Sequence, residues 1–384
     1  MNFFHRSLSF AMLACVSNGV AHSSSAKHDG HVILSEAKDL NRSTTRRLRS
    51  AEILRASSSD ALRMIASLGM FAAPGESQQP APAKIKLLTL LGRPLQLVAA
   101  EKLGLFSRFG IEVESENSSN SQELRDKLAA GGGDIAYLAV DNAVALVELA
   151  HQDVVIVMGG EGSQNELIAR PEIKSTKDLR GKTVLVDAPN TAYALQLKKI
   201  LILSGMQAGR DYEMKAYGAT PQRLIAMREN KSYAASMLGP PSSIIAKREG
   251  FVSLGSVQES IGRYQAAGFF TERKWAQDHR EALTNFLAAV IEAQRWLLAP
   301  ANKNDVLALM TRDTHLAPEV AAETYESTMT KPGGYAKDAA FDLPGFQNVL
   351  KLRAEIEGSW GGHPPAPEKY YDASYYDAAL PKLK

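Results

Sequence analysis

Cysteine is nearly absent from this 384-residue sequence, in which the single copy is Cys15. One thiol can form neither an internal disulfide nor a cysteine-based metal site, so the sequence excludes both. The rest of the chain can therefore fold in an oxidising compartment without mispaired thiols.

An excess of one charge is also lacking, because 44 Lys and Arg residues are balanced by 42 Asp and Glu residues. No basic run interleaved with aromatic residues occurs in the body of the chain, so we expect no nucleic-acid partner. Hydrophobic residues make up 45% of the chain and charged residues 22%. This composition is typical of a soluble globular protein, and the length predicts two lobes or one large α/β unit.

The common catalytic motifs are missing as well. The sequence contains no GxSxG elbow, no HExxH pair, no phosphate-binding GxxxxGK[ST] loop and no GxGxxG after a strand. The eight histidines are scattered, so we expect no metal site and no cofactor. Three carboxylates, Asp141, Glu161 and Asp187, follow predicted strands. A general acid or base can stand there, but aspartate is also common in simple turns.

The chain starts with an export-like segment. Residues 1–21 combine a short basic start, an apolar stretch and a small-residue exit, which is the pattern of a secretory signal. This stretch is too short to span a bilayer stably. Residues 12–15 approximate a lipobox, which leaves lipid anchoring through Cys15 open. We therefore expect an exported protein.

A second leader-like segment follows. Residues 22–60 are rich in Ser and Arg without a sustained apolar period, so we expect them to be exposed. Residues 64–73 form another apolar stretch with a small-residue exit, and an amphipathic surface helix at 51–68 is the alternative. We assign residues 1–83 to leader and linker and expect the fold to begin near Lys84.

From Lys84 onward, short apolar runs that predict strands alternate with segments of helical spacing. The predicted strands are 84–91, 111–116, 134–140, 154–158, 167–170, 182–187, 212–217 and 233–237, and the helices between them are 95–103, 122–130, 142–149, 192–203 and 221–229. This alternation predicts an α/β fold with mainly parallel sheets flanked by helices. Beyond residue 270 the pattern predicts only helices, at 274–298, 303–312, 318–328 and 345–357.

Polar loops follow the predicted strands, at the positions where open α/β sheets bind ligands. These loops are 91–94, 139–142, 159–163, 187–191 and 238–241. In the fourth, Asn190 or Thr191 can cap the helix that starts near Ala192 and leave N–H groups that attract an anion. A cap that serves only its own helix is the competing interpretation.

Several short motifs then occur in a familiar order. They are Gly104-Leu-Phe106 followed by 109–113, then Gly133-Asp-Ile-Ala136, then Ser175 with Asp178-Leu-Arg-Gly-Lys182, and finally Ser204-Gly205, Pro240 and the tail at 371–375. Together they resemble the periplasmic substrate-binding proteins of ABC importers. The similarity is to the SsuA-like branch for sulfonates, nitrate, taurine and thiamine-pyrimidine precursors, and it covers residues 84–384.

The resemblance implies a type II two-lobed fold with a ligand cleft between the lobes and hinge closure on binding. The first lobe would comprise 84–160 and 266–384, and the second 161–265, with crossovers near 160–166 and 258–268. A small-molecule ligand, a membrane permease, a periplasmic location and a monomer are implied as well. The candidate ligand-binding residues are Arg93, Pro94, Asp141, Asn142, Glu161, Asp187, Asn190, Thr191 and Pro240.

Two other functions stay open. The chain could be an enzyme on the same fold, acting on a small heterocyclic or carbonyl substrate with Asp141, Glu161 or Asp187 as base. It could also be a sensor or scavenger whose closed form another membrane protein recognises. Fungal pyrimidine synthases of the superfamily carry a Cys-rich motif that this sequence lacks, which argues against their activity. The predicted pocket is not rich in Arg, so a strongly anionic sulfonate is not implied.

Overall fold

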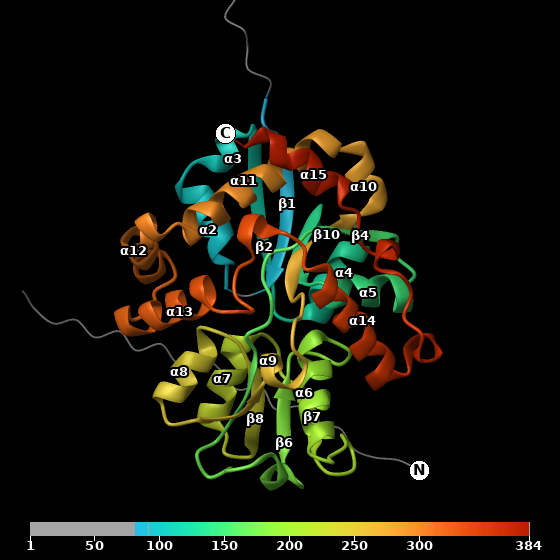
Figure 1. The fold of residues 1–384 in the computed structure, drawn as a ribbon, viewed down its shortest axis with the longest axis vertical. Coiled ribbons are helices and arrows are strands. Elements are labelled where there is room, and N and C mark those ends of the chain that lie inside the picture. Colours follow the sequence, from blue (N-terminus) through green and yellow to red (C-terminus); the bar gives the residue numbers. More distant parts are fainter. Residues whose placement is uncertain (1–80, 91, 384) are drawn as a thin grey trace, which may run out of the picture. The chain divides into compact units, whose positions relative to one another are not determined.

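A computed structural model describes residues 81–90 and 92–383. The expected signal sequence, Cys15 and the second apolar stretch at 64–73 lie outside the described residues. The described chain forms two five-stranded sheets, each flanked by helices (Figure 1), which confirms the predicted α/β fold. Within this part of the chain, no helix is both long and apolar enough to cross a membrane.

The first sheet has the strand order β2-β1-β3-β10-β4. Its strands are β1 (Ala83–Leu90), β2 (Ile111–Ser118), β3 (Ile135–Ala139), β4 (Val154–Met158) and β10 (Ala267–Glu272). β1 runs parallel to β2 and β3, whereas β10 runs antiparallel to β3 and β4. All residues of β4 are buried, as expected for an apolar strand that helices cover on both faces.

The second sheet repeats this topology with the order β7-β6-β8-β5-β9. Its strands are β5 (Glu166–Ala169), β6 (Thr183–Val186), β7 (Glu213–Ala216), β8 (Tyr233–Leu238) and β9 (Val252–Ser256). β5 is antiparallel to β8 and β9, and the remaining pairs are parallel. The antiparallel strands are β5 in the second sheet and β10 in the first, and each is the first strand that the chain forms after it crosses from the other sheet. The chain enters each sheet at the carboxyl ends of its parallel strands, so the entering strand must run in the opposite direction.

Helices of the first lobe come from both ends of the described chain. They are α2 (Leu95–Lys102), α3 (Leu105–Arg108), α4 (Ser121–Ala129), α5 (Asp141–Leu149), α10 (Arg273–Asp278), α11 (Arg280–Leu298), α12 (Lys303–Asp313), α13 (Pro318–Thr330), α14 (Leu343–Glu357) and α15 (Ser374–Ala379). The long helix α11 is central to this core. Its Phe286 stacks on Phe106 of α3, with ring centroids 5.7 Å apart.

The helices of the second lobe are α6 (Ala192–Leu203), α7 (Thr220–Glu229), α8 (Ser242–Arg248) and α9 (Val257–Ser260). The sequence analysis predicts α6 and α7 but no element at α8 or β9. β9 has the sequence VSLGS and is only partly buried, because it is an edge strand. Glycine and serine favour strands weakly, so the run lacks the apolar signal of the other strands.

Two crossovers connect the sheets, at 159–165 and at 257–266, and the two segments are bound to each other. The Glu161 amide donates to the Ala267 carbonyl at 3.3 Å, and the Ala266 amide donates to the Glu161 carbonyl at 3.1 Å. A third segment joins them, because the Gly162 amide donates to the Gly334 carbonyl at 3.0 Å. The crossovers are therefore held in a small ribbon of main-chain hydrogen bonds.

Candidate functional site

Loops at the carboxyl ends of the strands bring the two lobes into contact. After β7 and before α7, the Ala219 amide donates to the Ser119 carbonyl of the first lobe at 3.0 Å. Nearby, the Ser121 hydroxyl donates to Asp187 Oδ2 at 2.5 Å. Asp187 follows β6, and Ser121 begins α4. The predicted strand-end residue Asp187 thus lies at the boundary between the lobes.

Thr191 caps α6, and the cap serves the protein itself. Its hydroxyl lies 2.6 Å from Asp187 Oδ1 and 2.9 Å from the Ala188 carbonyl, and it accepts from the Ala194 amide at 3.4 Å. Thr191 and Asp187 are both buried. Asn190 has a φ of 57°, and its carbonyl accepts from Arg353 Nη2 at 3.0 Å. These polar atoms are therefore already occupied by protein partners.

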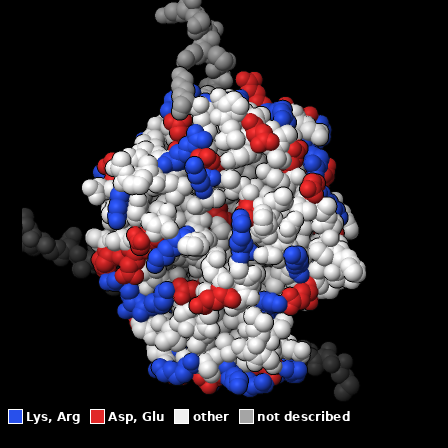
Figure 2. Space-filling view, viewed as in Figure 1, with Lys and Arg blue, Asp and Glu red and all other residues white. Residues whose placement is uncertain are grey.

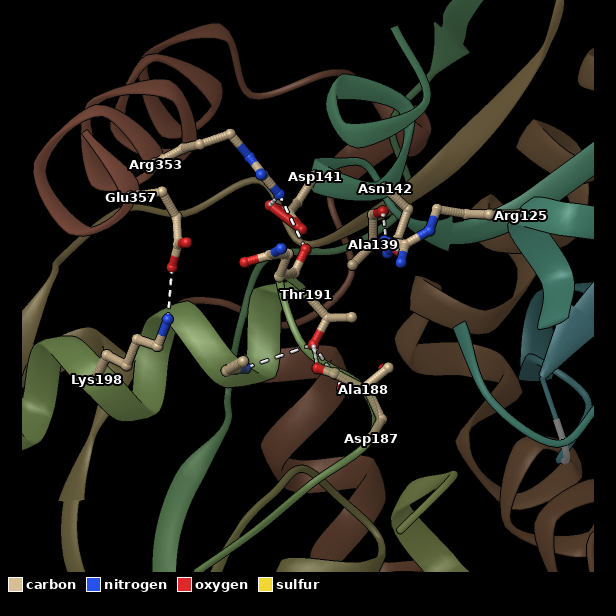
Figure 3. Close-up of polar contacts among 12 residues, drawn as sticks. Arg125, Ala139, Asp141, Asn142, Asp187, Ala188, Thr191, Lys198, Arg353 and Glu357 are labelled. Carbon is tan, nitrogen blue, oxygen red and sulfur yellow. Dashed lines mark hydrogen bonds and ion pairs between the residues drawn. The ribbon is translucent and has the colours of Figure 1, made fainter. Parts of the chain in front are cut away.

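Asp141 and Asn142, at the start of α5, each bind an arginine (Figure 3). Arg353 Nη2 of α14 donates to Asp141 Oδ1 at 2.9 Å, and both side chains are buried. Arg125 Nη1 donates to Asn142 Oδ1 at 2.9 Å. Because Arg353 also reaches the Asn190 carbonyl, it connects α5 of the first lobe to the start of α6 in the second.

A further set of charges reinforces this connection on the surface. Lys198 and Lys199 of α6 bind Glu357 and Glu355 of α14, with N–O distances of 2.5 and 2.6 Å. Helix α14 follows the last strand of the first lobe, yet it lies alongside α6 of the second lobe (Figure 1). Elsewhere on the face shown in Figure 2, acidic and basic side chains are intermixed.

Three of the sequence-predicted residues lie away from this network. The Arg93 guanidinium is exposed and binds Glu101, near the end of the following helix α2, rather than a group at the start of α6. Pro94 precedes α2, and its carbonyl accepts from the amides of Leu97 and Val98. Pro240 is half-buried and precedes α8.

Glu161 is the predicted residue with a free carboxylate. Its main chain is fixed in the crossover ribbon, and the side chain is half-buried. Burial raises its pKa from 4.5 to about 7, and no charged or hydrogen-bonding group of the described residues offsets this cost. The carboxylate is therefore enclosed by protein without a protein partner.

Three tyrosines lie near Glu161, from β3 (Tyr137), α6 (Tyr193) and the loop after α13 (Tyr335). Burial raises the pKa of each phenol, and the negative charge of Glu161 raises it further, which places all three near the carboxylate. Tyr137 borders the crossover directly, because a Cβ at Gly160 would lie 3.2 Å from its ring. Tyr335 forms an isolated antiparallel bridge with Glu161.

Gln96 of α2 completes the group. Its side chain is fully buried within reach of the Tyr137 phenol, whose pKa it lowers, yet neither its amide nitrogen nor its amide oxygen makes a hydrogen bond of regular geometry. Buried amides without partners are rare because they lose their hydration. We call Gln96, Tyr137, Glu161, Tyr193 and Tyr335 the crossover cluster.

Arg223 of α7 packs against the Tyr193 ring of the cluster. Its guanidinium carbon lies 4.6 Å from the centroid of the Tyr193 ring. Its N–H groups donate to the Ser236 and Thr220 hydroxyls and to the Gly218 and Met237 carbonyls. Burial lowers its pKa. All four hydrogen bonds of the Arg223 guanidinium are therefore made within the second lobe.

Of the crossover cluster, the sequence analysis identifies only Glu161. Gln96 carries a weak signal, since it is a polar residue between Leu95 and Leu97 at the start of an apolar helix. Tyr137 lies inside an apolar strand run and Tyr335 in a glycine-rich loop, where nothing distinguishes them from structural residues. Among the described residues, no group of His, Asp and Glu side chains could hold a metal ion.

Solved structures similar to this chain share its fold at low sequence identity. The periplasmic nitrate-binding protein NrtA of Synechocystis PCC 6803 is 15% identical, with a TM-score of 0.64 over 79% of this chain and 89% of that one. The alkanesulfonate-binding protein SsuA of Xanthomonas axonopodis pv. citri, bound to MOPS, is 16% identical, with a TM-score of 0.61 over 75% and 96%. The desulfurization enzyme DSZB is 11% identical, with a TM-score of 0.54 over 78% and 99%. The fold therefore accommodates both binding proteins and an enzyme.

Sequence comparison gives the family. No curated protein matches the chain. The profile of the NMT1-like family, by contrast, matches residues 79–311, which is more than half of the chain. The chain belongs to the NMT1-like family and has the two-lobed fold of the SsuA- and NrtA-type periplasmic binding proteins.

Proposed function

We propose that this protein is the solute-binding component of an ABC import system, which captures a small organic molecule between its lobes and delivers it to a membrane permease. The observation that carries the proposal is the crossover cluster. It gathers side chains from both lobes near a carboxylate without a protein partner and a buried amide without a regular hydrogen bond. Groups of this kind are suited to a ligand that supplies the missing hydrogen bonds.

In this proposal the other predicted residues position the lobes. Asp141, Asn142, Asp187 and Thr191 make protein contacts that join α5, α4, α6 and α14, although Asp141 Oδ2 is buried without a hydrogen-bond partner. They set the distance between the halves of the cluster. Arg93, Pro94 and Pro240 flank the strand ends without reaching into the cluster. The expected monomer and the lack of a cofactor stay predictions.

The location belongs to the same proposal. The export-like segment at 1–21 and the periplasmic neighbour NrtA both support a protein that works outside the cytoplasm. Anchoring through Cys15 would keep it at the membrane beside its permease.

An enzyme is the second candidate, because a carboxylate with a pKa of about 7 is suited to general base catalysis at neutral pH. The similarity to the enzyme DSZB is in keeping with it. The two functions differ in turnover. A binding protein returns its ligand unchanged, whereas an enzyme converts it when the protein is present in trace amounts.

The experiment is a thermal-shift screen of the purified protein against amines, amino acids, pyrimidines, carboxylates and sulfonates. A ligand at 100 times its Kd should add about 2.7 kcal/mol to the free energy of unfolding. Ligands found in this way are then incubated with the protein and recovered for mass spectrometry. Unchanged ligand supports the binding function, and a product of altered mass favours the enzyme. A screen without any stabilising compound contradicts both.

A further inference from the structure

We propose that the ligand is held through a positively charged nitrogen group, such as a protonated amine, amidine or guanidine, which binds the Glu161 carboxylate between the three tyrosine rings. This inference rests on the proposed solute-binding function and names its substrate class. It concerns the charge of the ligand, which the fold leaves open.

The first argument is the missing cation. Among the described residues, no Lys, Arg or His side chain forms an ion pair or hydrogen bond with the Glu161 carboxylate, and burial alone shifts its pKa. The Arg223 guanidinium, which packs against the Tyr193 ring, is bound to four acceptors of the second lobe. An enclosed carboxylate without a counter-charge is costly, and a cationic ligand removes that cost.

The second argument is the surrounding chemistry. Aromatic rings attract cations through their negative faces, and the Tyr137, Tyr193 and Tyr335 side chains lie near the carboxylate, with Tyr137 against Gly160 and Tyr335 bridged to Glu161 itself. The unpartnered Gln96 oxygen supplies a further acceptor for a second N–H of the ligand. Planar amidine and guanidine groups carry several N–H donors, so they can use both acceptors at once.

An anionic group fits this cluster poorly. Its attraction to Gln96 and to the phenol hydroxyls would be opposed by the like charge of Glu161, and Arg223 has few free donors to offset the repulsion. Like charges in such an enclosed site are costly. The cluster therefore selects against sulfonate, carboxylate and nitrate groups at this position.

Ligand binding should then depend on pH through Glu161. The titratable groups that face it are Tyr137, Tyr193 and Tyr335, with Arg223 and Asp187 behind Tyr193. The phenols stay protonated at neutral pH because burial raises their pKa values. An acid with a pKa of about 7 is roughly 9% ionised at pH 6 and roughly 91% ionised at pH 8. A permanently charged cation should thus bind about tenfold more tightly at pH 8 than at pH 6.

The test uses matched probes of one shape and different charge. The purified full chain is titrated with benzamidine, benzamide, benzoate and benzenesulfonate, and with phenethylamine and methylguanidine as further cations, by thermal shift and calorimetry at pH 6 and pH 8. Glu161→Gln is compared with Glu213→Gln, which changes an exposed carboxylate of β7. Circular dichroism verifies that each variant is folded.

We expect one or more cations to bind, about tenfold more tightly at pH 8, while the anions do not. Glu161→Gln should abolish the pH dependence and weaken binding at pH 8 at least tenfold, and Glu213→Gln should change neither. Binding of the anions but not the cations would overturn this inference and leave the solute-binding function standing. Cation binding that Glu161→Gln does not weaken would also overturn it. If no probe of either charge binds, this inference is overturned, and the wider thermal-shift screen alone decides whether the proposed solute-binding function stands.

Discussion

Replacing Glu161 by Gln should make the ligand-free protein more stable at alkaline pH. Folding raises the pKa of this carboxyl from 4.5 to about 7, because it is enclosed without a protein partner. The folded state thus retains a proton that the unfolded chain has released. The free energy of unfolding must therefore fall as pH rises from about 4.5 to about 7, and the lost stability is not recovered above that range. Glutamine has the same shape and stays neutral throughout.

The magnitude follows from the size of the shift. Each pKa unit corresponds to about 1.4 kcal/mol, so ionising Glu161 in the fold costs up to about 3 kcal/mol at pH 8 and less than about 1 kcal/mol at pH 5. These free energies are upper limits, because the Glu161 side chain is only half-buried and water screens part of its charge. For a chain of this length, about 3 kcal/mol corresponds to a rise in Tm of roughly 5–10 °C.

Thermal unfolding of the wild type, Glu161→Gln and Glu213→Gln at pH 5 and pH 8 measures this effect. The Tm difference between Glu161→Gln and the wild type should be small at pH 5 and large and positive at pH 8, whereas Glu213→Gln should follow the wild type at both. A Glu161→Gln protein that is less stable than the wild type at pH 8 would refute the reasoning. Such a result would mean that the ionised carboxylate has a stabilising partner.

The remaining predictions concern other parts of the chain. Arg353→Met should destabilise the protein by about 3–5 kcal/mol in urea unfolding, because it leaves the buried Asp141 carboxylate unpaired, and adding Asp141→Leu should restore much of the loss. Thr191→Ala should lower stability by about 0.5–2 kcal/mol through the lost cap of α6, while leaving the affinity for any ligand of the crossover cluster unchanged in calorimetry. N-terminal sequencing of exported protein should find a start after residue 21 or near Ala83, and recovery of intact Met1 would contradict export.

Much of the fold could be predicted from the sequence, because local patterns determine it. β4 and α6 occupy the predicted residues 154–158 and 192–203, where apolar runs are long and their boundaries are marked by turns. β9 was not predicted, since an edge strand needs few apolar residues and its Ser and Gly residues resemble a loop. The antiparallel direction of β5 and β10 was not predicted either. Strand direction depends on which edge of the sheet the chain enters, and periodicity carries no information about that.

The candidate site was much less predictable. Strand-end position made Asp141 and Asp187 candidates for ligand binding, whereas the structure pairs them with Arg353 and Ser121, which lie 212 and 66 positions away in the sequence. Arg93 resembled a binding residue because it follows the first strand, yet Glu101 of the next helix, α2, binds it. The tyrosines of the crossover cluster come from three separate elements. Only the tertiary fold brings them to one carboxylate.

The strand order also has a consequence for synthesis on the ribosome. β10 lies between β3 and β4, so β4 has no neighbouring strand in its sheet until β10 has been made. By then the whole of 166–256, with every strand of the second sheet, has left the ribosome. Domains whose contacts are close in sequence form first, whereas long-range pairing waits for its partner. The second lobe can therefore complete its sheet before the first lobe, although the first lobe begins earlier in the chain.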